Sequence, residues 1–340
     1  MTFSSRVALI ATGLIVVIAA AYYARMLLAP ITLAIVIGLM FGPVADRIER
    51  FGISSHFSAI VVLLAFILIL AIALTSVVLP ISIWIDRLPL IWQNIRSIMA
   101  EYNGIIESFS QMQDGMREIM GSDESMRVAV DDESPVSQVA WLAPTILAQI
   151  LLFLASLYFF VVARNDVRAA ILSICVNRRL RWRIARVFRD VEHLVSRYLL
   201  SITAINVGLG IAVGLAMWAA GVPSPYLWGL LAACLNYAIY VGPAVMAVIM
   251  LGVGLATYSG GAVLLPVAVY LSINMIEAQF VTPLVVGRSL TINPFLVFLA
   301  LAFWLWLWGP VGGFIAVPMS LIFVVILRNL LPQRPSQPAR

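Results

Sequence analysis

The chain has 340 residues, of which 63% are hydrophobic and only 11% are charged, and its mean hydropathy is +1.04. A soluble domain has about 45–50% apolar and about 25% charged residues, so this composition excludes an ordinary soluble protein and is typical of an integral membrane protein. The net charge of +5 arises from 21 arginines and no lysine against 16 acidic residues. Without a lysine there is no Walker A phosphate loop, which excludes ATP hydrolysis by that device.

The apolar runs predict an all-α membrane protein with about eight spanning helices, because a bilayer core needs about 20 apolar residues per helix. Residues 1–85 contain three such runs and residues 141–163 a fourth. We expect the first two spans at about 7–26 and 31–45, with a turn near Pro30, and the third at 57–85. A cleaved signal peptide is the alternative for the first run, but the apolar sequence continues past it, which favours a span.

Residues 86–140, between the third and fourth spans, differ in character from the rest. They contain ten acidic residues and four arginines, a net charge of −6. Apolar residues recur at helical spacing from Leu88 to Ile119, and the acid-rich segment from Gly121 to Ser137 follows. This pattern predicts a long extracytoplasmic amphipathic helix, lying on the bundle or on sister subunits, and then an acidic loop.

Residues 164–197 have the opposite charge, with nine arginines against three acidic residues. Their apolar residues share one helical face, which is typical of a basic amphipathic helix at a membrane surface. A patch of arginine and tryptophan would also fit nucleic acid, but cytoplasmic loops are rich in arginine by default, so we expect no nucleic-acid partner. Placing this segment in the cytoplasm places the N-terminus and the C-terminal tail, residues 331–340, there too.

Residues 198–330 form the predicted transport core, with spans at about 201–221, 226–257, 261–282 and 294–328. The second and the fourth of these are long and are interrupted by glycine followed by proline. Interrupted helices at matching places in two repeats indicate a transport site, although glycine and proline are also common in ordinary spans. The residues expected to break helices are Gly242, Pro243, Pro283, Gly287, Pro294, Gly309 and Pro310.

Glu277 is the one acidic residue in the sequence from 198 to 330. The 79 residues before it, from Tyr198 to Ile276, carry no formal charge. An acid inside a span normally faces the bundle interior or a water path, where it either carries protons or holds helices together. Asn274 lies three residues earlier on the same helical face, and Arg288 is a candidate counter-ion. Asn236 and Tyr240 complete the set of candidate transport residues.

Signals for an enzyme are weak. The two histidines, His56 and His193, have no partner at metal-ligand spacing, and no Gly-x-Ser-x-Gly motif occurs. We therefore expect no catalytic residues, no metal site and no cofactor.

Three segments of the core carry a family resemblance. "LWGLLAACLNYAIYVGPAV", "INMIEAQFVTPLVVGRSLTINPFLVFLAL" and "WGPVGGFIAVPM" resemble the autoinducer-2 exporter family of bacterial inner-membrane permeases. The resemblance covers the whole chain and is most specific in residues 198–330. One departure is Asn293, where many members have a histidine before the proline.

The resemblance implies a secondary transporter that exports a small polar molecule such as the quorum-sensing furanone. If transport needs energy, we expect it to come from the proton gradient. It also implies a homo-oligomer in the inner membrane. Sodium or lithium/proton antiport is the alternative among transporters. A scaffold or assembly factor that transports nothing is the alternative of another class.

Overall fold

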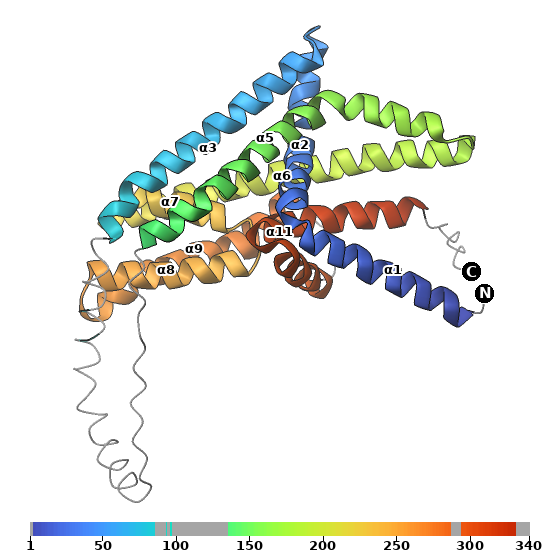
Figure 1. Ribbon diagram of the computed structural model, residues 1–340. Coiled ribbons are helices and arrows are strands. Elements are labelled where there is room, and N and C mark those ends of the chain that lie inside the picture. The colour runs from blue at the N-terminus through green and yellow to red at the C-terminus, as the bar shows by residue number, and fades with distance from the viewer. Residues whose placement is uncertain (1–2, 86–92, 94–95, 97–134, 287–293, 331–340) are drawn as a thin grey trace, which may run out of the picture.

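The computed structural model describes residues 3–85, 93, 96, 135–286 and 294–330 (Figure 1). The helices up to the middle of the chain are α1 (Phe3–Tyr23), α2 (Arg25–Arg50), α3 (Ser55–Ile85), α5 (Pro135–Ile174) and α6 (Arg178–Ala219). The later elements are α7 (Pro225–Leu235), α8 (Val241–Thr257), η1 (Gly260–Leu264), α9 (Leu265–Ile276), η2 (Glu277–Val281), α10 (Thr282–Val286) and α11 (Pro294–Leu330). No strand occurs in the described ranges, so the all-α fold predicted from the sequence is confirmed.

Seven of the described helical segments are long and apolar enough to cross a bilayer. They are Ser5–Tyr23, Arg25–Arg50, Ser55–Ser76, Pro144–Ile174, Arg178–Ala219, Gly260–Val285 and Phe295–Asn329. Many of their large apolar side chains are exposed, and the apolar stretch of α1 is not buried at all. Such a surface is stable against lipid tails and not against water, as expected of an integral membrane protein.

Helices α2, α3 and α5 share one apolar core, built around Ala34, Ala59 and Leu157. The small alanines let the helices approach closely, as is common in membrane bundles. The turn expected near Pro30 does not occur. Instead the chain turns at Ala24, and α2 continues through Pro30, a residue that spanning helices tolerate in a packed surrounding.

An arginine joins α5 to α2 at the end of this core. Arg164 forms ion pairs with Asp46 and, at 3.4 Å, with Glu49, and it donates to the carbonyl of Gly42 at 2.9 Å. Its side chain is only 8% exposed. The Ser58 hydroxyl donates to Glu49 at 2.9 Å and ties α3 to the same cluster.

A second core lies between α6, α7, α8 and α9. Its buried members include Met217, Trp228, Met246 and Tyr270. The second half of α11 packs on α2 and α6 through Val36, Val195, Leu199, Ile315 and Leu321, and so connects the two cores.

Helices α7 and α8 form a hairpin that enters and leaves the bundle at the same end. α7 runs back along α6, and the two helices are in close contact at Gly229 and Gly210. A Cβ added to Gly229 would lie 2.4 Å from the Gly210 carbonyl oxygen. α8 then returns, and the hydroxyl of Tyr258 donates to the carbonyl of Ala220, just after the end of α6. Figure 1 shows both helices at the end of the bundle where α9 begins.

This hairpin differs from the single interrupted span expected at residues 226–257. With 11 residues, α7 is about 16 Å long and therefore too short to cross a hydrocarbon core of about 30 Å. The chain leaves the α-helical path at residues 236–240, and Gly242 and Pro243 lie in the first turn of α8.

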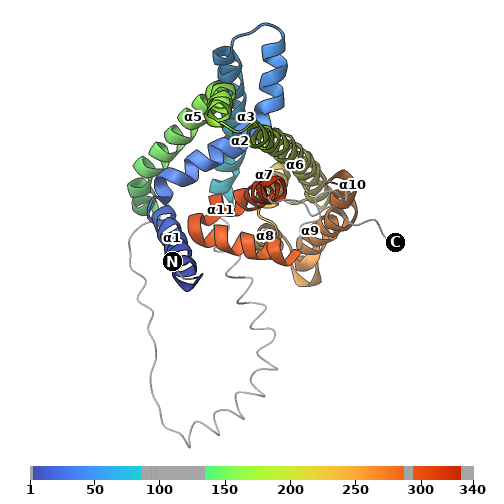
Figure 2. The same cartoon turned by 90° about the vertical axis from the view of Figure 1, so that its right-hand side faces the viewer.

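Helix α11 bends sharply at Trp308 and Gly309, whose backbone angles are not helical. A Cβ on Gly312 would lie 1.8 Å from the Trp304 carbonyl oxygen. In a straight helix these two residues would be far apart. In Figure 2 the first half of α11 runs across the view, whereas the second half is seen nearly along its axis. The Trp308 indole donates to the carbonyl of Ala21 at 3.0 Å and fixes the bend against the end of α1.

The charged segments fall partly within the described residues. α5 continues to Ile174 and α6 begins at Arg178, with the Asn177 side chain accepting from the Arg179 amide at 2.9 Å. The segment 164–197 is thus two helix ends joined by a short turn. The amphipathic helix and acidic loop expected within 86–140 lie almost entirely outside the described residues, as does the tail 331–340.

Candidate functional site

Glu277 lies where the helix that follows the hairpin changes its hydrogen-bonding pattern. Residues Glu277–Val281 form one π-helical turn between α9 and α10. Pro283 explains the change, because its nitrogen cannot donate one α-helical turn back and its ring would clash with the carbonyl there. Glu277 is 8% exposed, and its carboxylate accepts a hydrogen bond from the Thr282 hydroxyl. The acid is therefore held inside the bundle.

Three asparagines from three elements form a chain of side-chain hydrogen bonds beside this turn. The amide nitrogen of Asn274 on α9 donates to the oxygen of Asn236 at 3.4 Å. The amide nitrogen of Asn236, in the break between α7 and α8, donates to the oxygen of Asn206 on α6 at 2.9 Å. Because Glu277 follows Asn274 by three residues, the asparagine chain and the acid lie on neighbouring parts of one helix face.

The chain of amides ends in an unused donor. Asn206 is 1% exposed, and its amide nitrogen has no acceptor within hydrogen-bonding distance among the described residues. A buried donor without a partner costs about 1–3 kcal/mol, so proteins rarely keep one without a use. The arrangement leaves a hydrogen-bond donor for a polar group that enters the site.

A second polar pair connects the break to the rest of the bundle. The Tyr237 hydroxyl donates to the Thr203 hydroxyl on α6 at 2.8 Å. The ring of Tyr237 packs against Phe314 in the second half of α11, with 4.9 Å between ring centroids. The break between α7 and α8 thus contacts both α6 and the helix that follows the bend in α11.

Glu277 borders a cavity of about 360 Å³ between α6 and the α9–α10 segment. Small residues of α6, including Ala204, Gly208 and Ala212, form one wall. Ile273, Val281 and Val285 form much of the other. An apolar cavity with one polar group at its wall is the usual composition of a small-molecule site.

The structure brings three of the predicted site residues together and separates one. Asn236, Asn274 and Glu277 share the site described above. Tyr240 is exposed, and its φ of +66° places it in the turn that leads into α8. Arg288 lies outside the described residues, so the expected pairing with Glu277 stays a prediction.

The residues expected to break helices have different local roles. Pro283 follows the π turn, and Pro294 begins α11. Gly309 adopts a φ of +60°, which a side chain would strain, and Pro310 starts the second half of α11. Gly287 lies outside the described residues.

Two features of the structure go beyond the predicted site. Asn206 and Thr203 are polar residues within a predicted span, and the unused donor of Asn206 has no signature in the sequence. In the sequence, Arg164 cannot be distinguished from the other eight arginines of residues 164–197. Its burial is seen only in the fold.

The sequence model of AI-2E family transporters matches residues 12–331, nearly the whole chain. The chain belongs to the AI-2E transporter family. This membership agrees with the resemblance found in the sequence.

Several members of the AI-2E family are similar to this chain. The AI-2 transport protein TqsA of Escherichia coli (strain K12) is 36% identical over 135 residues, which are 40% of this chain and 39% of the relative. The putative transport protein YrrI of Bacillus subtilis (strain 168) is 32% identical over 146 residues, 43% of this chain and 41% of the relative. The similarity thus spans about two fifths of each of these relatives. A putative transport protein of Mycobacterium tuberculosis, MT0215, is 25% identical over 316 residues, 92% of this chain and 85% of the relative.

Proposed function

We propose that this AI-2E family protein is a secondary transporter of a small polar molecule. Its transport core is the part of the chain between residues 198 and 330, and its recognition site consists of Asn206, Asn236, Asn274 and Glu277. Membership in a family of transporters, and relatives named as transport proteins, support the activity. The observation that carries the site is the buried amide nitrogen of Asn206, which has no acceptor in the described structure.

The proposed substrate is a small hydroxylated molecule such as the autoinducer-2 furanone. One relative is named as a transporter of AI-2. Hydroxyl groups both donate and accept hydrogen bonds, and they match the mixed donors and acceptors of the asparagine chain. The apolar cavity beside Glu277 would take the carbon frame of such a molecule.

The break between α7 and α8 and the bend in α11 support movement around this site. Transporters place substrate sites where spanning helices are broken, because free backbone groups and loose packing meet there. Tyr237, in the first break, packs against Phe314, which follows the second. A rearrangement at one break would therefore act on the other.

Glu277 is the proposed coupling group. Glu277 is buried inside the bundle, and acids kept inside spanning helices commonly belong to ion or proton pathways. The π turn adds to this role, since single π-helical turns mark functional positions in many helices.

The proposed orientation has both termini in the cytoplasm of a bacterium. The arginine-rich start of α6 supports it through the excess of positive charge in cytoplasmic segments. Asn329, near the end of α11, donates to Asp190 of that segment at 3.3 Å, so both lie at one end of the bundle. The largely exposed apolar surface of α1 supports assembly into a homo-oligomer.

Flux into proteoliposomes tests the proposal. The purified protein is reconstituted, a pH gradient is imposed, and uptake of labelled furanone is compared for wild type, Glu277→Gln and Gln279→Leu. Gln279 is exposed on the same π turn and serves as the matched control. We expect gradient-driven flux in wild type and Gln279→Leu, and its loss in Glu277→Gln.

Other outcomes would contradict parts of the proposal. Unchanged gradient-driven flux in Glu277→Gln would remove Glu277 from coupling. Proton release on addition of sodium or lithium, without furanone flux, would identify a cation antiporter instead. Absence of any flux from a folded wild-type protein would favour the scaffold hypothesis.

A further inference from the structure

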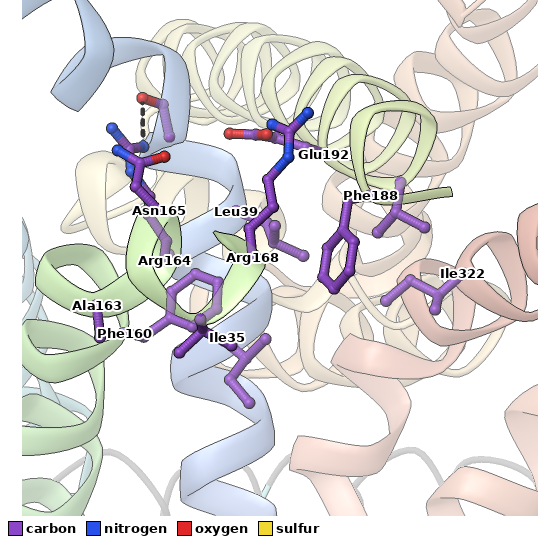
Figure 3. A pocket seen from close by; sticks show the side chains of 14 residues that line it. Ile35, Leu39, Phe160, Ala163, Arg164, Asn165, Arg168, Phe188, Glu192 and Ile322 are labelled. Atoms are coloured by element: carbon purple, nitrogen blue, oxygen red, sulfur yellow. Dashed lines mark hydrogen bonds between the residues drawn. The ribbon is translucent and has the colours of Figure 1, made fainter. Parts of the chain in front are cut away.

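A pocket of about 250 Å³ lies between α2, α5, α6 and α11, away from the asparagine site (Figure 3). Its walls are apolar, with Leu39, Phe160, Phe188 and Ile322 among the lining residues. On α6 it is lined by Phe188, Val191 and Glu192, which lie within the arginine-rich part of that helix. Arginine-rich ends of spanning helices normally lie at the level of the lipid headgroups.

The rim of this pocket carries two side chains of opposite charge. Figure 3 shows Arg168 rising from α5 and Glu192 projecting from α6 toward the same rim. Both line the pocket and are half-buried, and among the described residues neither forms an ion pair or a hydrogen bond. Two opposite charges that share a pocket without pairing leave room for a ligand that carries both signs.

A third group points to the same kind of ligand. Arg164 also lines the pocket, and its terminal nitrogens are used by Asp46, Glu49 and Gly42. Its Nε is buried and has no acceptor in the part of the chain that the structure describes. A buried guanidinium N–H favours an anionic oxygen such as that of a phosphate.

We propose that this pocket binds a phospholipid with a primary ammonium headgroup, phosphatidylethanolamine. The phosphate accepts hydrogen bonds from Arg168 and from Arg164 Nε, and the ammonium group lies against Glu192. An acyl chain fills the apolar part between α2 and α11. Glu192 provides the selectivity, because a quaternary choline headgroup offers it no N–H donor and a glycerol headgroup offers it no positive charge.

Native mass spectrometry of the full chain tests this site. Protein is mixed with equal amounts of phosphatidylethanolamine, phosphatidylcholine and phosphatidylglycerol, and the bound fraction of each lipid is measured. We expect wild type to prefer phosphatidylethanolamine by about tenfold, a ratio that corresponds to about 1.4 kcal/mol. Glu192→Gln should make phosphatidylethanolamine and phosphatidylcholine equal, and Arg168→Gln should weaken all three lipids.

Two exposed residues give matched controls for charge. Arg186→Gln on α6 and Asp166→Asn on α5 remove the same charges outside the pocket, and both should keep the wild-type preference. The preference is a ratio of lipids bound to one protein sample, so a less stable variant does not lose the preference merely because less folded protein is present. Equal binding of the three lipids by wild type, or pocket variants that match the controls, would overturn the proposal. Displacement of the lipid by equimolar glycerophosphoethanolamine, which lacks acyl chains, would overturn the assignment to a lipid.

Discussion

The side-chain nitrogen of Asn236 lies 2.9 Å from the side-chain oxygen of Asn206, and this bond ties the break between α7 and α8 to α6. Asn236 can donate there because α7 ends at Leu235 and leaves the next residues outside regular helix. This bond uses the Asn206 oxygen, and the Asn206 nitrogen has no acceptor among the residues that the structure describes. One helix break therefore creates both the attachment and the unused donor.

The hairpin formed by α7 and α8 predicts that both of its ends are accessible from the same face of the membrane. In a background with Cys234 replaced by serine, Tyr226→Cys and Ser259→Cys should react with a membrane-impermeant thiol reagent from one face, because both positions lie at the same end of the bundle. The native Cys175, at the opposite end of α6, should react only from the other face. Labelling of positions 226 and 259 from opposite faces would show that residues 226–257 cross the membrane once.

The close approach within the hairpin predicts a large cost for one extra methyl group. A Cβ on Gly242 would lie 1.7 Å from the Leu235 carbonyl oxygen, whereas Gly252 on the same helix has no atom within 4 Å of that position. Gly242→Ala should lower stability by about 1–3 kcal/mol through overpacking. Gly252→Ala should change it by less than about 0.5 kcal/mol. Thermal unfolding in detergent measures both, and equal midpoints for the two variants would contradict the hairpin geometry.

Arg164 and its acidic partners should differ in how much each stabilises the fold. Arg164→Met leaves Asp46 and Glu49 without their cation, and a broken buried pair costs about 3–5 kcal/mol. Asp46→Asn should cost less than about 1 kcal/mol, because the Asp46 side chain is 44% exposed and Arg164 keeps Glu49 and Gly42. Unfolding midpoints of the two variants check the order. A larger loss in Asp46→Asn would be evidence against the buried position of Arg164.

The helical membrane fold is predictable from the sequence because it depends on local composition. A run of apolar residues must form a helix in lipid, since no water satisfies its backbone groups. The hairpin is not predictable in this way. Residues 226–257 have the same apolar composition whether they cross once or return as two short helices, and the decision depends on Gly229 meeting Gly210 and Tyr258 meeting Ala220.

The candidate site was predictable in part for a similar reason. Glu277 and Asn274 stand out because polar residues in a span are costly. The bond between Asn206 and Asn236 joins residues 30 positions apart, and Arg164 lies more than 100 positions from its partners. Residues so far apart along the sequence cannot be paired from local sequence patterns, so these contacts become visible only in the packed structure.

We propose that the asparagine chain recognises the transported molecule. The most direct test of this role is the concentration dependence of furanone flux in proteoliposomes, comparing Asn206→Leu with Ser272→Ala. Ser272 is exposed on α9, and its hydroxyl bonds only within its own helix at 2.8 Å, so it serves as the control. If Asn206 donates to the substrate, Asn206→Leu should raise KM about tenfold, as expected for the loss of one buried hydrogen bond, while Ser272→Ala should leave KM unchanged. A folded Asn206→Leu protein with the wild-type KM would show that Asn206 does not bind the substrate.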